Sequence, residues 1–205
     1  MNTRQTRWQL AHAGLFVTTC LVTLTPFAKC QDAPPAGAKE QTNDVAVFKE
    51  FMDRVHGYIT LHKSVESSLP ALKPTALPEM ITAHQQAMAR KIRQARPHAK
   101  PGDIFSAGAR AAFRRTVQDE FRGPDAHAAR TTIRQGEPLK TVQLRVNEPY
   151  PDGVPYTTVP PSLLLRLPKL PVEVAYRIVA RDLILLDVDA NLVVDKIAEI
   201  FPQAI

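Results

Sequence analysis

The chain has 205 residues, of which 44% are hydrophobic and 22% charged, with 26 Lys and Arg against 20 Asp and Glu. A chain of this length forms one domain, with or without a short extension, which excludes a large multidomain enzyme. The balance of apolar and charged residues is typical of a globular protein. It excludes both a membrane-embedded bundle and a highly charged disordered chain.

The first thirty residues have the layout of a secretory signal peptide. Basic residues precede an apolar stretch over 10–24, and small residues follow. Signal peptides combine a basic start, an apolar stretch of about 7–15 residues and a small-residue cleavage site. We therefore expect residues 1–30 to direct export to the periplasm or the cell exterior, with cleavage after Ala28 or Cys30. An uncleaved signal that anchors the chain in the membrane, or lipidation at Cys30, are the alternatives.

Cleavage would leave a weakly charged domain that is nearly free of cysteine. Cleavage after Ala28 removes only Cys20. Cleavage after Cys30 lowers the formal net charge from +6 to +3 and removes both cysteines, Cys20 and Cys30. The folded domain would then have no internal disulfide, no thiolate metal site and no cysteine nucleophile. We expect no transmembrane span after cleavage, and no cofactor.

The next segment and the first half of the domain are predicted from composition and helical spacing. Residues 31–43 are small, polar and proline-containing, which predicts a flexible linker before a single domain over 44–205. Apolar residues recur at helical spacing through the helical half, residues 44–136. Proline, glycine and capping residues divide this half into four predicted helices, over 45–69, 78–96, 103–123 and 124–136.

The spacing of apolar residues changes in the β-rich half, residues 137–205. Alternation over 142–146 predicts a short strand, and one or two helical turns are predicted at Pro160. Three β-rich runs with short loops then predict an antiparallel meander. The predicted fold is α+β, with an N-terminal bundle of three to four helices packed on a small C-terminal antiparallel β-meander.

Basic residues gather around the junction of the second and third predicted helices. The eight cations are Arg90, Lys91, Arg93, Arg96, Lys100, Arg110, Arg114 and Arg115. Such a cluster can bind an anionic envelope component or an acidic partner protein, although a solvated surface is the alternative. No aromatic platform accompanies it, so no nucleic acid is expected. We therefore predict a non-enzymatic, envelope-associated binding module.

A metal-handling role for nickel, cobalt or zinc in the periplasm is the second hypothesis. His62 and Glu66 lie four residues apart on the first predicted helix, with His56 nearby. Residues four apart share a helix face, although zinc sites use three or four ligands. The alternative is that His62 and His84 are half-buried and pack between the first two helices.

A third hypothesis, a hydrolase, has little support in the sequence. The chain has no G-x-S-x-G or S-x-x-K motif and no glycine-rich phosphate loop. A deep pocket lined by Tyr58, His62 and His84 would support this hypothesis.

The run Asp187-x-Asp189-x-Asn191 starts like a calcium loop. Such a loop needs glycine at its sixth position and glutamate at its twelfth, where this chain has Leu192 and Ala198. The run is therefore interpreted as a turn rich in Asp and Asn between two strands.

Two resemblances add expectations. Five runs resemble a family of secreted proteins of unknown function from environmental bacteria, over most of residues 44–203. The runs are 58–72, 98–105, 113–115, 159–171 and 176–195. The segment 176–197 is also similar to the C-terminal hairpin of the periplasmic nickel/cobalt-homeostasis family related to RcnB. That second resemblance implies metal handling.

Overall fold

The computed structural model describes residues 36–74, 76–135 and 142–201. The expected signal peptide, both cysteines and the first part of the expected linker lie outside these ranges. Within them, no helix has both the length and the apolar character needed to cross a bilayer.

Four helices form the first half of the described chain, as predicted. They are α1 (Ala36–Ser67), α2 (Pro78–Ala95), α3 (Ala107–Arg122) and α4 (Ala126–Gln135). The helix α1 begins earlier than expected. Residues 36–43, which belong to the predicted linker, are helical. Ala, Lys, Glu and Gln predominate in this segment and are strong helix formers, and no proline follows until Pro70.

The helix α3 begins at Ala107, four residues after its predicted start at Asp103. Ser106 is its N-cap, and its hydroxyl accepts a hydrogen bond from the backbone N–H of Ala109 at 3.3 Å. Asp103 instead accepts a bond from the N–H of Lys100 at 3.0 Å within the preceding turn.

The loop between α2 and α3 is held by one buried carboxylate, that of Asp195. It accepts hydrogen bonds from the backbone N–H groups of Gly102, Ile104 and Phe105, at 3.0, 2.8 and 2.8 Å. It also accepts the N–H of Lys196 at 2.7 Å. These bonds fix the loop in a non-helical conformation, which explains the late start of α3.

The second half contains a four-stranded antiparallel sheet. Its strands are β1 (Thr157–Thr158), β2 (Val174–Val179), β3 (Asp182–Asp187) and β4 (Leu192–Ile197), in the order β1-β2-β3-β4. The predicted three-strand meander is thus confirmed, and β1 adds a short edge. A single helical turn, α5 (Pro161–Leu164), follows β1 at the predicted place.

The strand predicted over 142–146 is wrong. These residues lie outside the sheet, and the segment after them runs beside β4 instead: the N–H of Asn147 bonds to the carbonyl of Val193 at 2.7 Å, and Pro149 bridges to Leu192. Asn147 has a φ of 64° and Pro149 has no N–H to donate, so the ladder cannot extend.

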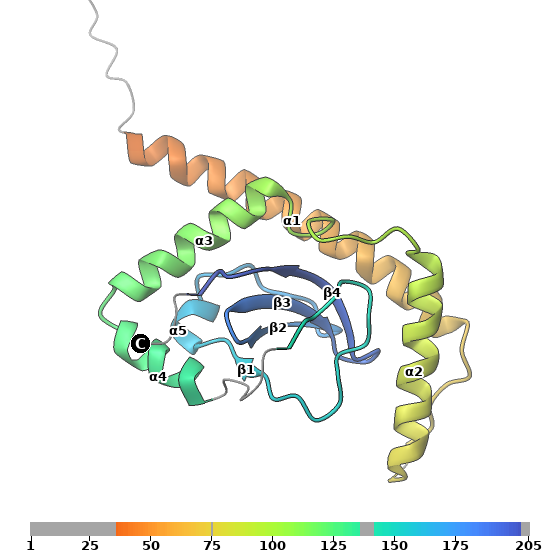
Figure 1. The fold of residues 1–205 in the computed structure, drawn as a ribbon. Coiled ribbons are helices and arrows are strands. Elements are labelled where there is room, and N and C mark those ends of the chain that lie inside the picture. The colour runs from red at the N-terminus through yellow and green to blue at the C-terminus, as the bar shows by residue number, and fades with distance from the viewer. Residues whose placement is uncertain (1–35, 75, 136–141, 202–205) are drawn as a thin grey trace, which may run out of the picture. The chain divides into compact units, whose positions relative to one another are not determined.

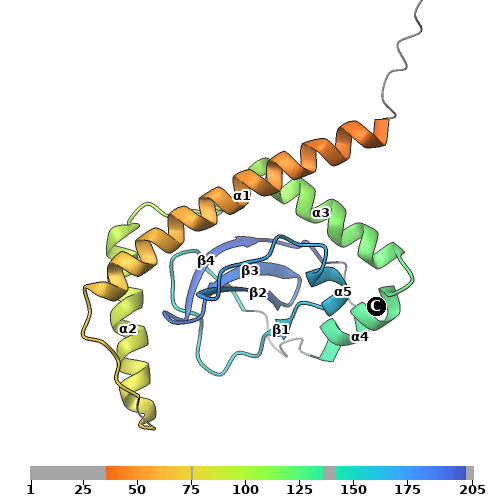
Figure 2. The same ribbon diagram turned by 180° about the vertical axis from the view of Figure 1, so that it is seen from behind.

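The sheet is covered on both faces, which explains its nearly continuous apolar strands. Helices cover one face, where Phe51, Phe105, Phe113 and Tyr176 form an aromatic core with ring centroids 5.1–6.4 Å apart. The segment 142–154 covers the other face. In both views α1 crosses the sheet while α2 and α3 lie on opposite flanks of it (Figures 1 and 2).

Candidate functional site

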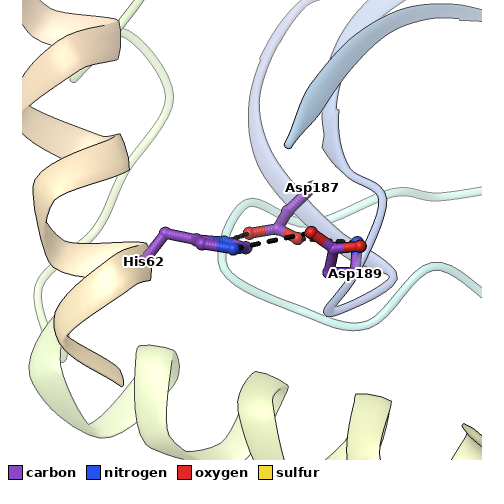
Figure 3. Close-up of side chains that lie close together, drawn as sticks. All are labelled: His62, Asp187 and Asp189. Atoms are coloured by element: carbon purple, nitrogen blue, oxygen red, sulfur yellow. Dashed lines mark hydrogen bonds and ion pairs between the residues drawn. The ribbon is translucent and has the colours of Figure 1, made fainter. Parts of the chain in front are cut away.

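Three side chains that can bind metal meet where α1 passes the turn between β3 and β4. They are His62 of α1 and Asp187 and Asp189 of the turn, with one ligand atom from each lying within 4.8 Å of the others (Figure 3). In the described part of the chain this is the one such group of three or more.

Asp187 is the centre of the cluster and is fully buried. Its Oδ2 accepts hydrogen bonds from the Tyr58 hydroxyl at 2.6 Å and from His62 Nδ1 at 2.7 Å. Its Oδ1 accepts the backbone N–H groups of Asp189 and Ala190 at 3.1 and 2.8 Å. These last two bonds form an Asx turn, as predicted for this run. The carboxylate therefore shapes the turn and also holds α1 against it.

His62 presents its second ring nitrogen to another carboxylate. The side chain has no exposed surface, and within the described residues its Nε2 makes no hydrogen bond. Nε2 lies 3.5 Å from Oδ2 of Asp189, whose side chain is 55% exposed. A neutral ring that donates its Nδ1 proton to Asp187 has a lone pair on Nε2. This lone pair faces the negatively charged oxygen of Asp189. A cation between the two atoms, either a proton on Nε2 or a metal ion, removes this repulsion.

The surrounding charges favour a cation. The hydrogen bond to Asp187 raises the pKa of His62, and the charges of Asp187, Asp189 and Glu66 add to this while burial opposes it. Burial raises the pKa of Asp189, as do the neighbouring carboxylates of Asp187, Glu66 and Glu173. Three carboxylates thus act on one imidazole.

Burial also raises the pKa of Tyr58, and the adjacent Asp187 carboxylate raises it further. The phenol therefore stays protonated and remains a hydrogen-bond donor. It fixes the orientation of Asp187 and has no role as a base.

The spacing of the two open ligand atoms fits a metal ion. Zinc–nitrogen and zinc–oxygen bonds of about 2.0–2.2 Å at a tetrahedral angle place the ligand atoms roughly 3.4 Å apart. The distance from His62 Nε2 to Asp189 Oδ2 is 3.5 Å. An ion can therefore bind between them with almost no change in the turn.

The structure places only one of the three residues predicted for metal binding in the cluster. His62 lies in the cluster, and Glu66 follows it by one helical turn, close enough that its charge acts on both His62 and Asp189. His56 is exposed and is not part of the group. His84 is half-buried on α2, as the alternative interpretation expected. His62 is fully buried and contacts the β3–β4 turn.

The eight predicted cations come from α2, from the loop after it and from α3 (Figure 1). Several are engaged within the chain: Lys91 donates to the carbonyl of Ser68, Arg96 lies 5.2 Å from the Tyr58 ring centroid, and Arg114 donates to the carbonyl of Ala198. Arg115 pairs with Asp44.

Two of these cations line a shared hollow. Arg90 and Arg93 are exposed one turn apart on α2 and border a space of about 310 Å³ beside the loop that carries Tyr150. Lys100 is exposed in the loop after α2, and Arg110 borders a different hollow beside α3. Binding of an anionic envelope component stays a prediction.

The partners of His62 could not be predicted from the sequence. Asp187 and Asp189 were assigned only to a turn, and 125 residues separate His62 from Asp187. A histidine on an apolar helix face and a pair of aspartates in a turn are each common. Only the packing of α1 against the sheet brings them together.

No protein-family model, curated protein or solved structure matches this chain. Both family resemblances therefore remain predictions, and the site is interpreted from its own geometry.

Proposed function

We propose that this chain is an exported protein that binds a divalent transition metal, zinc, nickel or cobalt, through His62, Asp189 and Glu66. The observation that carries the proposal is the buried Nε2 of His62. It has no hydrogen-bond partner among the described residues and faces a carboxylate oxygen at 3.5 Å.

Each residue has a distinct role. His62 supplies the nitrogen ligand, and Asp187 bonds to its other ring nitrogen, which fixes the tautomer and raises the basicity of the ligand. Asp189 supplies an oxygen ligand and, because its side chain is partly exposed, opens a route to solvent. Glu66 is exposed one helical turn after His62 and lies outside the group of close ligand atoms, so its carboxylate would have to turn toward the ion to become a third ligand. Imidazole with carboxylates suits zinc, nickel and cobalt.

The same geometry argues against a hydrolase. A carboxylate–histidine pair that activates a nucleophile presents the second ring nitrogen to a hydroxyl or thiol. Here that nitrogen faces the Asp189 carboxylate. The walls of four hollows on the described part of the chain include none of Tyr58, His62 and His84.

Calorimetric titration of the purified chain with zinc, nickel and cobalt chloride tests the proposal. We expect saturable binding with one ion per chain, and a loss of affinity of at least tenfold in Asp189→Asn. This substitution keeps the size of the side chain and leaves the backbone N–H of Asp189 free to bond Asp187. Asp152→Asn, in another exposed turn, is the matched control and should bind as the parent does.

Two results would overturn the proposal. One is the absence of any binding heat at micromolar protein with all three metals. The other is equal affinity in the parent and in Asp189→Asn, with circular dichroism showing both folded. His62→Gln is a secondary variant, because it also breaks the bond to Asp187.

A second role, association with an anionic envelope surface, is favoured by the placement of Arg90 and Arg93. Both are exposed, and no ion pair to them is found among the described residues. Replacing both by Gln should lower binding to vesicles that contain phosphatidylglycerol. Unchanged binding would remove this surface from consideration.

A further inference from the structure

An apolar depression at the edge of the sheet lies between β2 and the segment that follows α5. This groove has a volume of about 510 Å³, which is within the usual range for small-molecule sites. Its walls are mainly aliphatic, with contributions from Val159, Leu164, Leu165, Leu167, Leu170 and Val174. It is separate from the metal cluster, and the inference below does not rest on the proposed function.

Prolines in the sequence create the groove. Pro160 and Pro161 follow β1 after one residue, Val159, and neither has an N–H to donate, so β1 ends after pairing only with Arg177 and Ile178 of β2. The first residues of β2, starting at Val174, therefore pair with β3 on one side and border the groove on the other.

Two of three consecutive leucines form one wall of the groove. Leu163 is fully buried in the main core, whereas Leu164 and Leu165 line the groove, and Leu165 is 89% exposed. Together with the aliphatic floor of the groove they form one contiguous apolar patch, which is the kind of surface that binds another apolar group.

The charges in the groove all have one sign. Lys169 and Arg177 are the charged residues among those that line it, and no carboxylate of the described chain lines it or pairs with either. Arg177 is held in place, because its Nη1 donates to the carbonyl of Tyr176 at 2.9 Å and its guanidinium lies 5.1 Å from the Tyr156 ring centroid. Its Nε is buried and makes no hydrogen bond within the described residues.

We propose that the groove binds an anionic single-chain amphiphile, a long-chain fatty acid. The alkyl chain would lie along the leucine wall, and the carboxylate would lie against Lys169 and Arg177. An apolar wall selects for a hydrocarbon chain, and two unpaired cations select for one anionic head group.

Titration with sodium laurate below its micelle concentration tests this proposal with the full chain. We expect saturable binding of one laurate per chain, and affinities for dodecanol and for dodecyltrimethylammonium at least tenfold lower. The variant that combines Lys169→Gln and Arg177→Gln should lose at least tenfold in laurate affinity. Lys100→Gln, which changes an exposed cation outside the groove, should match the parent.

A variant of the wall keeps the test valid if the double variant does not fold. Leu165→Ser alters a side chain that contributes almost nothing to the folded core and should weaken laurate binding at least threefold, whereas Met80→Ser, at an exposed position on α2, should not. The absence of saturable laurate binding would overturn the proposal, as would equal affinity for the three head groups. Association with phosphatidylglycerol vesicles without binding of monomeric laurate would replace it with a membrane contact.

Discussion

The hydroxyl of Tyr58 lies 2.6 Å from Oδ2 of Asp187, and both groups are buried. The same oxygen accepts a hydrogen bond from Nδ1 of His62, which lies one turn further along α1. One carboxylate thus joins two consecutive turns of a helix to a turn of the sheet. Breaking either bond leaves a buried charge with fewer donors, which is costly to stability.

Tyr58→Phe should destabilise the protein by about 1–3 kcal/mol, because it removes one donor to a buried carboxylate and keeps the aromatic ring. The measurement is the free energy of unfolding in urea. Tyr150→Phe is the matched control, since its hydroxyl donates a longer bond, 3.3 Å, to the carbonyl of Pro155. An equal loss of unfolding free energy in both variants would show that the bond to Asp187 stabilises the protein no more than the bond to Pro155 does.

Asp195→Asn should destabilise the protein by about 2–3 kcal/mol, because the amide turns one acceptor oxygen into a donor among backbone donors. Hydrogen exchange should locate the effect. The amides of Ile104 and Phe105, which bond to Asp195, should lose protection first. Uniform loss of protection across the sheet and the loop would contradict this local role.

The metal-free protein should become less stable as the pH rises above neutrality. The pKa of His62 is raised in the folded state, mainly by its hydrogen bond to Asp187. The imidazolium therefore stabilises the fold fully below the unfolded pKa, about 6.5, and this contribution is lost as the pH passes through the folded pKa.

Urea unfolding between pH 5 and pH 9, with and without His62→Gln, measures this contribution. The parent should lose stability with rising pH across the upper part of this range, and the variant should lose less. Identical pH profiles would show that the proton on His62 is not linked to folding.

Zinc should stabilise the folded chain. A ligand that binds only the folded state, at a free concentration of 100 times its Kd, raises the free energy of unfolding by about 2.7 kcal/mol. Addition of a chelator should reverse the increase. In Asp189→Asn the increase at the same zinc concentration should be smaller, and an equal increase would place the ion elsewhere.

Two glycines should respond to alanine in opposite directions. Gly57 lies within α1, and an added Cβ would meet nothing within 4 Å, so Gly57→Ala should stabilise by about 0.5–1 kcal/mol. Gly102 has a φ of +99°, and an added Cβ would lie 3.4 Å from Nη1 of Arg110. Gly102→Ala should therefore destabilise the protein, and urea unfolding of both variants checks the contrast.

The sequence predicted the elements whose ends are marked by proline or glycine. The start of α2 at Pro78 and the end of α3 before Gly123 match the structure. The start of α3 was predicted wrongly because Asp195, some 90 residues later, holds the preceding loop in a non-helical conformation. Local spacing contains no information about a bond over that distance.

The site was predicted only in part for the same reason. Helical spacing predicted that His62 and Glu66 share a helix face, but it could not show that His62 faces the turn at Asp187. The sequence also could not show that Lys91 donates to the carbonyl of Ser68 or that Arg114 donates to that of Ala198, because these partners lie far away along the chain.

The bonds from Asp195 to the loop between α2 and α3 also join parts of the chain that are far apart in sequence. Until β4 is in place, the amides of Ile104 and Phe105 lack the carboxylate that they bond to in the folded protein. We therefore expect the loop to reach its final form together with the sheet, and not as a separate early intermediate.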